Sequence, residues 1–514
     1  MAAAAAVPRT LSDLPDDVLR RILFFAPATE GASTAVLSRR WHYLWRASGA
    51  VNLDSRCFTL VPDDEPKDIL LGTGAGDAPI TRLTIALAEG SRSSIRLAHL
   101  DDRSWPESDD LAARRRPEEL RVEVKDWNQL QYNVFSLPSP ALRLLRISNC
   151  ASLTAAAAFP LLSELRLHKC TVPVADLQRI ADAAPKLTTL HLESCYIPRQ
   201  EQQGFHMHPP ETQRWLLIFP EVTHLVLAGC RYDRRAMPML ELDAPRLRYF
   251  RYDGSLQGCH HQLSLKQQAS PKPNNMVRVD LCLRDHQTFG QQVLESFWQF
   301  IRNFSTAKVL KVELDYLLSM DRIALTDDRS RDELLGSLSF PNLERLELEA
   351  GYEAGNEASM VMLADLLHCC PLLQNLRLKF IKDGRMVLSS VDKEARLDFD
   401  KSVNRFRRRR SPMISLSGEG NENHEVCYIP GLSGESFDCL QYLRRVSLYF
   451  CMEEADCLGV QLAKFFAENA MVLEEIYLHD GSQKMAEHMN GSVRRWIANS
   501  AKTRNLAGIE VLPH

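Results

Sequence analysis

The sequence of 514 residues lacks the features of several large classes of protein. No apolar run approaches the roughly 18 residues that a membrane-spanning helix needs. The 13 cysteines include no C-x-x-C pair, which favours reduced intracellular thiols over a disulfide framework. Neither sign of charge dominates: the net charge is −4, which argues against a protein-wide electrostatic field for nucleic acid.

Motifs of catalysis and of cofactor binding are also missing. Neither H-E-x-x-H nor G-x-S-x-G occurs, and Gly72-x-Gly74-x-Gly76 lacks the Lys-Ser/Thr that completes a phosphate-binding loop. Cys259-His260-His261 and His206-x-His208 lack the second pair of ligands that a metal site needs. We therefore expect no metal, no cofactor and no catalytic residue, so the protein is not expected to be an enzyme.

The composition is that of a folded protein, with 45% hydrophobic and 25% charged residues. The length predicts about three domain-sized units, or a small module followed by a long repeat array. Residues 1–10 are rich in alanine and lack the pattern of a secretory signal, so we expect a disordered tail.

Residues 11–50 predict a module of three short helices. Pro15 suits the first position of a helix, and Asp16 and Asp17 follow in its first turn, where they meet the positive end of the helix dipole. Thr29 and Ser38 are candidate caps of a second and a third helix. The third helix places Trp41, Leu44 and Trp45 on one face.

This module has more apolar surface than it can bury. Roughly 35 residues rarely form an independent core, and the surplus, which includes both tryptophans, predicts a groove on a partner protein.

The module resembles the F-box of plant proteins. The matching residues are Leu14-Pro15-Asp16-Asp17, then Leu19, Ile22 and Leu23, then Val36-Leu37-Ser38-x-Arg40-Trp41, and finally Leu44-Trp45. The resemblance implies a module that docks on the Skp adaptor of a cullin-based ubiquitin ligase. Carried over by position, the adaptor contacts or their direct supports are Leu14, Pro15, Leu19, Ile22, Val36, Leu37, Trp41, Leu44 and Trp45. Two departures, Ala26 in place of a bulky leucine and Gly31-Ala32 in the second helix, leave open that the F-box is degenerate.

The rest of the chain repeats the pattern L-x-x-L-x-L at intervals of roughly 20 to 35 residues, which is typical of leucine-rich repeats. The copies begin at Ile80, Leu142, Leu162, Leu187, Val222, Leu247, Met276, Val309, Leu343, Leu373, Leu443 and Leu473. The stretches between copies at 174–184, 290–304, 358–369 and 457–470 are expected to be helical or irregular, and Leu177, Ile180 and Ala181 of the first have helical spacing. The expected fold class is α/β: a three-helix F-box, followed by an irregular solenoid with one curved, mostly parallel sheet and outer helices. Cysteines that end several copies are interpreted as small buried hydrophobic residues.

These patterns predict the domain order. The F-box spans 11–50, the repeats span 78–380, a polar basic insertion spans 382–428, and 429–500 resembles the C-terminal FBD region of plant F-box/repeat proteins. Within the insertion, Arg405–Arg410 includes five arginines, which indicates a solvated loop, a nuclear import signal or an electrostatic anchor. We expect the protein in the nucleus, the cytoplasm or both.

Residues that alternate with the core positions of each strand are candidates for binding a target protein. They are Arg166, His168, His191, Glu193, Tyr249, Arg251, Glu347, Glu349, Arg377, Lys379 and Tyr477. Their alternating charges favour recognition of a complementary protein surface.

The leading hypothesis is the substrate-recognition subunit of an SCF-type ubiquitin ligase, whose partners are a Skp-type adaptor, through it a cullin, and a target protein. The alternative is a non-degradative scaffold with a degenerate F-box. Nucleic-acid binding through Arg405–Arg410 is disfavoured by the net charge. No membrane partner is expected, and whether a small molecule completes the binding face stays open.

Overall fold

The computed structural model describes residues 10–53, 81–87, 117–124, 133–134, 141–149, 152–153, 158–198, 214–232, 239–255, 263–265, 276–284, 291–315, 320, 323–325, 328–336, 338–352, 358–382, 438–450 and 458–479. The chain divides into two compact units, Met1–Leu247 and Arg248–His514. The α/β fold class is confirmed, with N-terminal helices followed by a mostly parallel sheet of fourteen strands.

The first unit opens with the three predicted helices, preceded by a single 3-10 turn. The elements are η1 (Leu11–Asp13), α1 (Asp16–Phe25), α2 (Ala28–Thr34) and α3 (Arg39–Arg46). Pro15 is the N-cap of α1, and the predicted cap of α3 is confirmed because the Trp41 N–H donates to Ser38 Oγ at 3.4 Å. The predicted cap Thr29 is wrong: α2 begins at Ala28, directly after Pro27, so Thr29 lies inside the helix.

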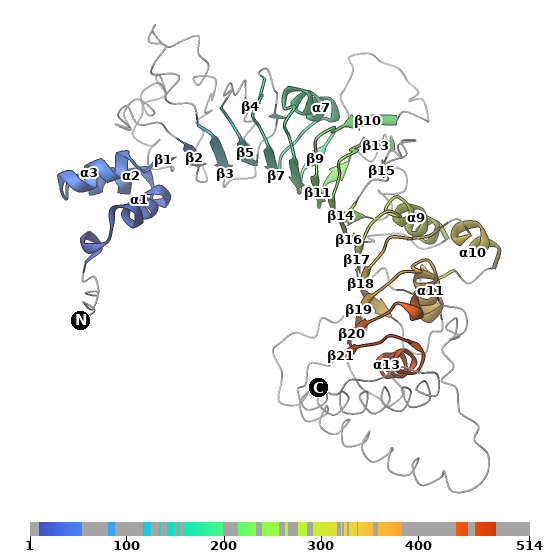
Figure 1. Cartoon of the computed structure of the whole chain (residues 1–514). Coiled ribbons are helices and arrows are strands. Elements are labelled where there is room, and N and C mark those ends of the chain that lie inside the picture. The colour runs from blue at the N-terminus through green and yellow to red at the C-terminus, as the bar shows by residue number, and fades with distance from the viewer. Residues whose placement is uncertain are drawn as a thin grey trace, which may run out of the picture. The chain divides into compact units, whose positions relative to one another are not determined.

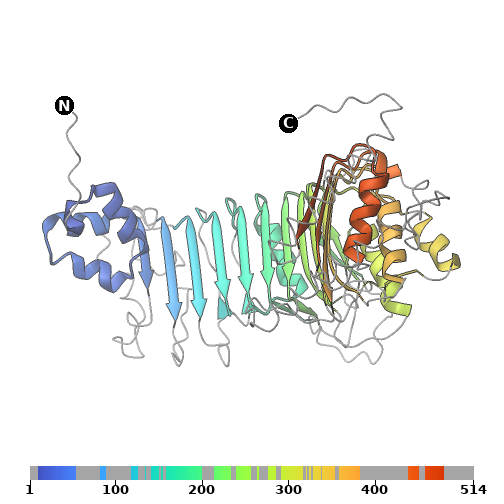
Figure 2. The ribbon, with the colours of Figure 1, turned by 90° about the horizontal axis from the view of Figure 1, so that it is seen from below.

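Seven strands of the main sheet follow in the first unit, in chain order: β1 (Ala50–Leu53), β2 (Arg82–Leu87), β3 (Glu119–Val124), β5 (Leu144–Ser148), β7 (Glu164–His168), β8 (Thr189–Glu193) and β11 (His224–Ala228). Each strand pairs in parallel with the next. Helix α7 (Val174–Ala183) covers one face of this sheet (Figures 1 and 2). Its N-cap is Pro173, and Asp176 lies in the first turn.

The second unit continues with β14 (Tyr249–Ser255), β16 (Arg278–Arg284), β17 (Val309–Leu314), β18 (Arg345–Tyr352), β19 (Asn375–Lys382), β20 (Arg445–Tyr449) and β21 (Glu475–His479), again parallel and in chain order. Its helices are α9 (Gln291–Arg302), α10 (Asp328–Leu335), α11 (Ala358–His368) and α13 (Leu458–Asn469), with a 3-10 turn η4 (Asp438–Gln441). All four helices lie on one side of these strands (Figure 1). The four stretches that were expected to be helical or irregular thus contain helices, at 174–183, 291–302, 358–368 and 458–469.

Short strands complete the fold: β4 (Asn133–Val134), β6 (Ser152–Leu153), β9 (Tyr196–Ile197), β10 (Arg214–Ile218), β12 (Arg231–Tyr232), β13 (Met239–Asp243) and β15 (Leu263–Leu265). In the first unit β10 pairs with β13 in parallel. The Gln178 side-chain amide connects α7 to this pair, because it accepts from the Ile218 N–H at 2.8 Å and donates to the Ile218 carbonyl at 3.3 Å.

The structure revises the repeat pattern in two ways. First, β1 and β3 are strands for which the sequence pattern gave no copy. Second, the copy beginning at Val309 is out of register: Ala307, Leu310 and Val312 are fully buried, whereas Val309 pairs with Arg278 on the face away from the helices. The small side chain of Ala307 at the leucine position hides the true start of this copy.

Alternating strand residues divide the sheet into a core face and a second face, which we call the open face. In β5 and β7, for example, Leu145, Ile147, Leu165 and Leu167 are buried, while the residues between them are only half-buried. The core side chains of successive strands stack in register, so each strand completes the hydrophobic cover of its neighbour.

Most of the described cysteines are buried core residues, whereas Cys230 and Cys282 are half-buried. The thiols of Cys170, Cys195 and Cys230 donate to carbonyl oxygens of the preceding coil, at 3.4 to 3.5 Å. Burial raises the pKa of Cys369 and of Cys439 to about 12. The thiols of Cys369 and Cys439 therefore stay protonated at neutral pH, as expected of small buried hydrophobic residues.

One carboxylate lies in the core of the second unit. Asp365 on α11 is 1% exposed and forms an ion pair with Arg331 of α10, while its Oδ2 has no hydrogen-bond partner among the described residues. Burial raises the pKa of Asp365 from 3.8 to about 6, against the opposing effect of Arg331.

A raised pKa in the folded state makes the stability from Asp365 largest below pH 4 and lost as the pH rises through 6. We expect this group to lower the unfolding free energy by about 2–3 kcal/mol between pH 4 and pH 7. Asp365→Asn should remove that part of the pH dependence in urea unfolding. The exposed control Glu474→Gln should retain it, and equal slopes for wild type and Asp365→Asn would contradict the prediction.

Candidate protein-interaction sites

The F-box module is held together by contacts between the two ends of its sequence motif. The Arg40 guanidinium binds the Asp16 carboxylate through Nε and a terminal nitrogen, at 2.9 and 2.7 Å, and also donates to the Leu14 carbonyl at 2.7 Å. The Trp41 indole N–H donates to Ser12 Oγ at 3.3 Å. The chain leading into α1 is therefore fixed against the start of α3.

The predicted adaptor residues divide into core and surface. Leu19, Leu23, Trp41 and Leu44 form the core of the module, and Leu14 and Trp45 pack against it. Pro15, Ile22, Val36 and Leu37 are exposed. The buried residues can only act as supports, whereas the exposed ones are available to a partner.

The F-box module exposes surplus apolar surface, as predicted, but Trp41 and Trp45 do not form it. Trp41 is only 6% exposed, which corrects the expectation that both tryptophans belong to the surplus. The exposed large apolar residues of the module are instead Leu11, Val18, Ile22, Phe25, Val36, Leu37 and Tyr43. Val36 and Leu37, in the turn before α3, are exposed by 89% and 70%.

Gly31 has a packing role that the sequence did not reveal. This residue is buried in α2, and a Cβ built on it would lie 2.3 Å from Nε1 of Trp45. Glycine thus lets α3 place the Trp45 ring directly against α2. The glycine is therefore part of the packing of the module and not a sign of degeneracy.

The end of α1 is anchored on the open face of the first two strands. The Asn52 amide of β1 donates to the carbonyls of Phe24 and Ala26, at 3.0 and 2.8 Å. Arg82 of β2 is 5% exposed, donates to the same Phe24 carbonyl and stacks over the Phe24 ring, 3.8 Å from its centroid. Burial and the nearby Arg121 lower the pKa of Arg82. These donors satisfy carbonyls that a helix end otherwise leaves unpaired.

The predicted target-binding residues form separate clusters on the open face of each unit. In the first unit, Arg166 lies beside His191, and His168 lies beside Glu193. In the second unit, Glu347 and Glu349 of β18 pair in register with Arg377 and Lys379 of β19.

The remaining candidates lie on strands of the second unit. Tyr249 and Arg251 are on β14, and Tyr477 is on β21. The Tyr249 hydroxyl donates to Asp280 at 2.8 Å, and burial followed by this hydrogen bond raises the pKa of Tyr249.

Sequence reasoning missed Tyr449, Arg121 and Arg146 of this face. Arg377 lies 4.7 Å from the ring centroid of Tyr449, which stacks on His479 with 4.2 Å between ring centroids. Arg121 and Arg146 share a row with Arg166. Arg146 could have been found from the buried Leu145 and Ile147 that flank it, whereas Arg121 lies on β3, for which no copy was recognised.

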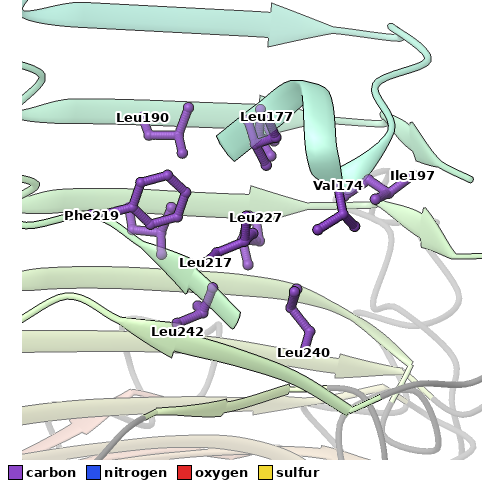
Figure 3. Close-up of a pocket in the computed structure, with 11 residues that line it drawn as sticks. Val174, Leu177, Leu190, Ile197, Leu217, Phe219, Leu227, Leu240 and Leu242 are labelled. Carbon is purple, nitrogen blue, oxygen red and sulfur yellow. The ribbon is translucent and has the colours of Figure 1, made fainter. Parts of the chain in front are cut away.

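An apolar cavity lies between α7, β10, β13 and the main sheet of the first unit (Figure 3). Leu177, Leu190, Leu217, Phe219 and Leu240 are among its lining residues, all of which are hydrophobic. Its volume of about 10 Å³ is at the lower limit for a single water molecule. We interpret it as a packing gap rather than a ligand site.

Other sequence candidates lie outside the described residues: the Gly72–Gly76 loop, His206 and His208, Cys259–His261, and Arg405–Arg410 with its insertion. Within the described part of the chain, no group of three or more His, Cys, Asp or Glu residues could hold a metal ion. No helix of that part is long and apolar enough to cross a membrane.

Comparison with known proteins matches these observations. The F-box domain family matches residues 11–49. A putative FBD-associated F-box protein of Arabidopsis thaliana is 44% identical over 50 residues, which cover 10% of this chain and 27% of that protein. An F-box/LRR-repeat protein of the same plant is 33% identical over 89 residues, which cover 16% of this chain and 23% of that protein.

A longer alignment extends the similarity into the repeats. Another F-box/LRR-repeat protein of Arabidopsis thaliana is 23% identical over 399 residues, 71% of this chain and 72% of that protein. By contrast, the chain spans only about a quarter of the length of the two shorter-matching relatives. The chain carries an N-terminal F-box domain and is a relative of the plant F-box/LRR-repeat and FBD-associated F-box proteins.

The contact between Gly31 and Trp45 predicts that Gly31→Ala destabilises the F-box. The clash should cost about 1–3 kcal/mol, which outweighs the gain of about 1 kcal/mol in helix propensity. A lower melting temperature in differential scanning fluorimetry would show this. Ala32→Ser, at the exposed neighbouring position, should leave the melting temperature unchanged; a stabilised Gly31→Ala variant would refute the packing role.

Asn52→Ala should free the end of α1, because it leaves the Ala26 carbonyl without this donor. We expect a loss of about 1–2 kcal/mol in unfolding free energy and faster hydrogen exchange at the end of α1. Thr84→Ala, on the open face of β2, is the matched control and should leave exchange in α1 unchanged. Protection of α1 that is identical in Asn52→Ala and wild type would show that the anchor is unimportant.

Proposed function

We propose that this protein is the substrate-recognition subunit of an SCF-type E3 ubiquitin ligase. In this proposal the F-box docks on a Skp-type adaptor, which connects it to a cullin, and the open face of the repeats binds a target protein. The similarity to F-box/LRR-repeat proteins supports the adaptor class.

The observation that carries the proposal is the exposed apolar surface of the F-box. Val36 and Leu37 are largely exposed although the module has its own complete core around Leu19 and Trp41. Each square ångström of apolar surface removed from water contributes about 25 cal/mol. A partner that covers these side chains therefore gains affinity without any rearrangement of the core.

In this function the chain performs no bond chemistry itself. Holding a target near the charged conjugating enzyme raises the local concentration of its lysines, and this proximity accelerates ubiquitin transfer. Nuclear or cytoplasmic location is part of the proposal, and the arginines of 405–410 support a nuclear fraction.

The alternative of a scaffold with a degenerate F-box rested on Ala26 and Gly31. Gly31 has a structural explanation, because it makes room for Trp45. The Ala26 contact with Asn52 is made by the backbone carbonyl and does not explain the alanine side chain. The packing at Gly31 therefore supports an intact module and favours the ligase subunit.

Leu37→Asp places a charge on the proposed docking surface without touching the core. We expect it to reduce capture by an immobilised Skp-type adaptor by about tenfold or more, since the charge would have to be desolvated in the interface. Leu372→Asp is the matched control, because Leu372 is also an exposed leucine, at 43%, but lies in the second unit. Unchanged capture of Leu37→Asp, with wild-type melting, would refute this docking surface.

A further inference from the structure

An uninterrupted row of arginines crosses the open face of the first unit. Arg121 on β3, Arg146 on β5 and Arg166 on β7 are direct partners in adjacent parallel strands. Adjacent strands lie about 4.8 Å apart, and like charges placed directly opposite each other destabilise a sheet. His191 on β8 continues the same row.

Neighbouring carboxylates neutralise this row only in part. Glu119 pairs with Arg121, but Glu164 is shared between Arg166 and Arg146, which it meets at 3.3 Å. The buried Nε of Arg146 has no hydrogen-bond partner among the described residues. On its own strand, the open-face neighbours of Arg146 are the uncharged Leu144 and Ser148. Arg146 is thus the least neutralised cation of the row.

The equivalent row of the second unit shows that such a run is not required by the fold. There Arg251, Asp280, Lys311, Glu347 and Arg377 occupy successive strands in register. Each cation there faces a carboxylate on at least one adjacent strand, so no two cations of that row are direct partners. The arginine row instead leaves room for an anion that the described residues do not supply.

We propose that the arginine row binds an acidic segment of the target protein, extended across the strands, with oxyanions on Arg146 and Arg166. This proposal rests on the proposed function and names the chemistry of its target. The planar fork of arginine suits carboxylate and phosphate oxygens, which it binds through two parallel hydrogen bonds.

The geometry sets the spacing of the acidic residues. One strand spacing, roughly 4.8 Å, separates Arg146 from Arg166. Side chains on one side of an extended peptide recur every two residues, roughly 6.6 Å, and the long arginine side chains can span the difference. In the next row, Ser148 and His168 lie between Glu123 and Glu193. Glu123 and Glu193 repel anions at the two ends of that row. The favoured position for a bound oxyanion is therefore beside Arg146, next to Ser148 at the centre of the row.

The test uses the full chain and fluorescent twelve-residue peptides of glycine and serine. One peptide carries two phosphoserines two residues apart, a second carries glutamates at the same positions, and a third is neutral. Fluorescence anisotropy should show binding of the two acidic peptides and none of the neutral one. The phosphoserine and glutamate arms distinguish a modified target from a constitutively acidic one.

Variants locate the site. Arg146→Gln should weaken acidic-peptide binding by about tenfold or more, since it removes a charge-assisted contact. Arg146→Lys, which keeps the charge but loses the fork, should weaken it less. Lys311→Gln, at the same row position of the second unit, is the matched control and should change affinity less than about twofold. Melting temperatures of all variants should equal that of wild type.

Equal binding of neutral and acidic peptides, or full affinity in Arg146→Gln, would overturn the inference. Tighter binding of single-stranded DNA than of the acidic peptides, with the same dependence on Arg146, would also overturn it in favour of nucleic acid. Adaptor capture separates this inference from the proposed function. If wild type and Arg146→Gln both capture the adaptor but bind no acidic peptide, only the inference fails; if wild type captures no adaptor, the proposed function fails.

Discussion

The parallel, in-register stacking of coils is the constraint on which the rest of this structure depends. A strand such as β5 buries Leu145 and Ile147 on one side only, and its edges need a neighbouring strand for their hydrogen bonds. Each coil is therefore stable only between two others. The first coil has no preceding strand in the sheet order, and α1 and α2 contact its strand β1 instead. The F-box thus provides the N-terminal end of the array with a cover.

Under the proposed function, this arrangement gives one module two tasks that use different surfaces. The carbonyl end of α1 lies on β1 and β2 through Asn52 and Arg82, while the turn with Val36 and Leu37 stays exposed. Because the core around Leu19 and Trp41 is complete within the module, neither task has to supply the other's stability. An interface can then change in affinity without loosening the end of the repeat array.

The sequence predicted those parts of the fold that depend on large, regularly spaced side chains. Strands with leucine at every core position were found, whereas β1 and β3 were missed and β17 was shifted, because Ala307 stands where the pattern has leucine. The F-box residues were recognised as a set, but spacing alone could not separate the buried Trp41 from the exposed Leu37. That separation depends on how three helices pack, and in particular on Gly31 beneath Trp45.

The candidate site was harder to predict than the fold because charge balance is a property of neighbouring coils, not of one strand. Arg166 was predicted as a binding residue from the pattern of its own repeat. Its part in a row of like charges depends on Arg146 and Arg121, which lie one and two coils earlier. The row exists only once β3 is recognised as a strand. Insertions between coils conceal this register in the sequence, although the register itself is fixed by backbone pairing.

The positions of the arginine row and the F-box in the chain also affect how a bound target would be presented for ubiquitin transfer. The arginine row and the F-box belong to the same compact unit, and Asn52 and Arg82 fix the F-box to the first two strands of that unit. Ubiquitin transfer by proximity needs a target held at a steady distance from the adaptor, since a loose connection lowers the effective concentration of its lysines. An acidic segment bound across β3, β5 and β7 would meet this need, because Asn52 and Arg82 join the F-box directly to the strands of the same unit.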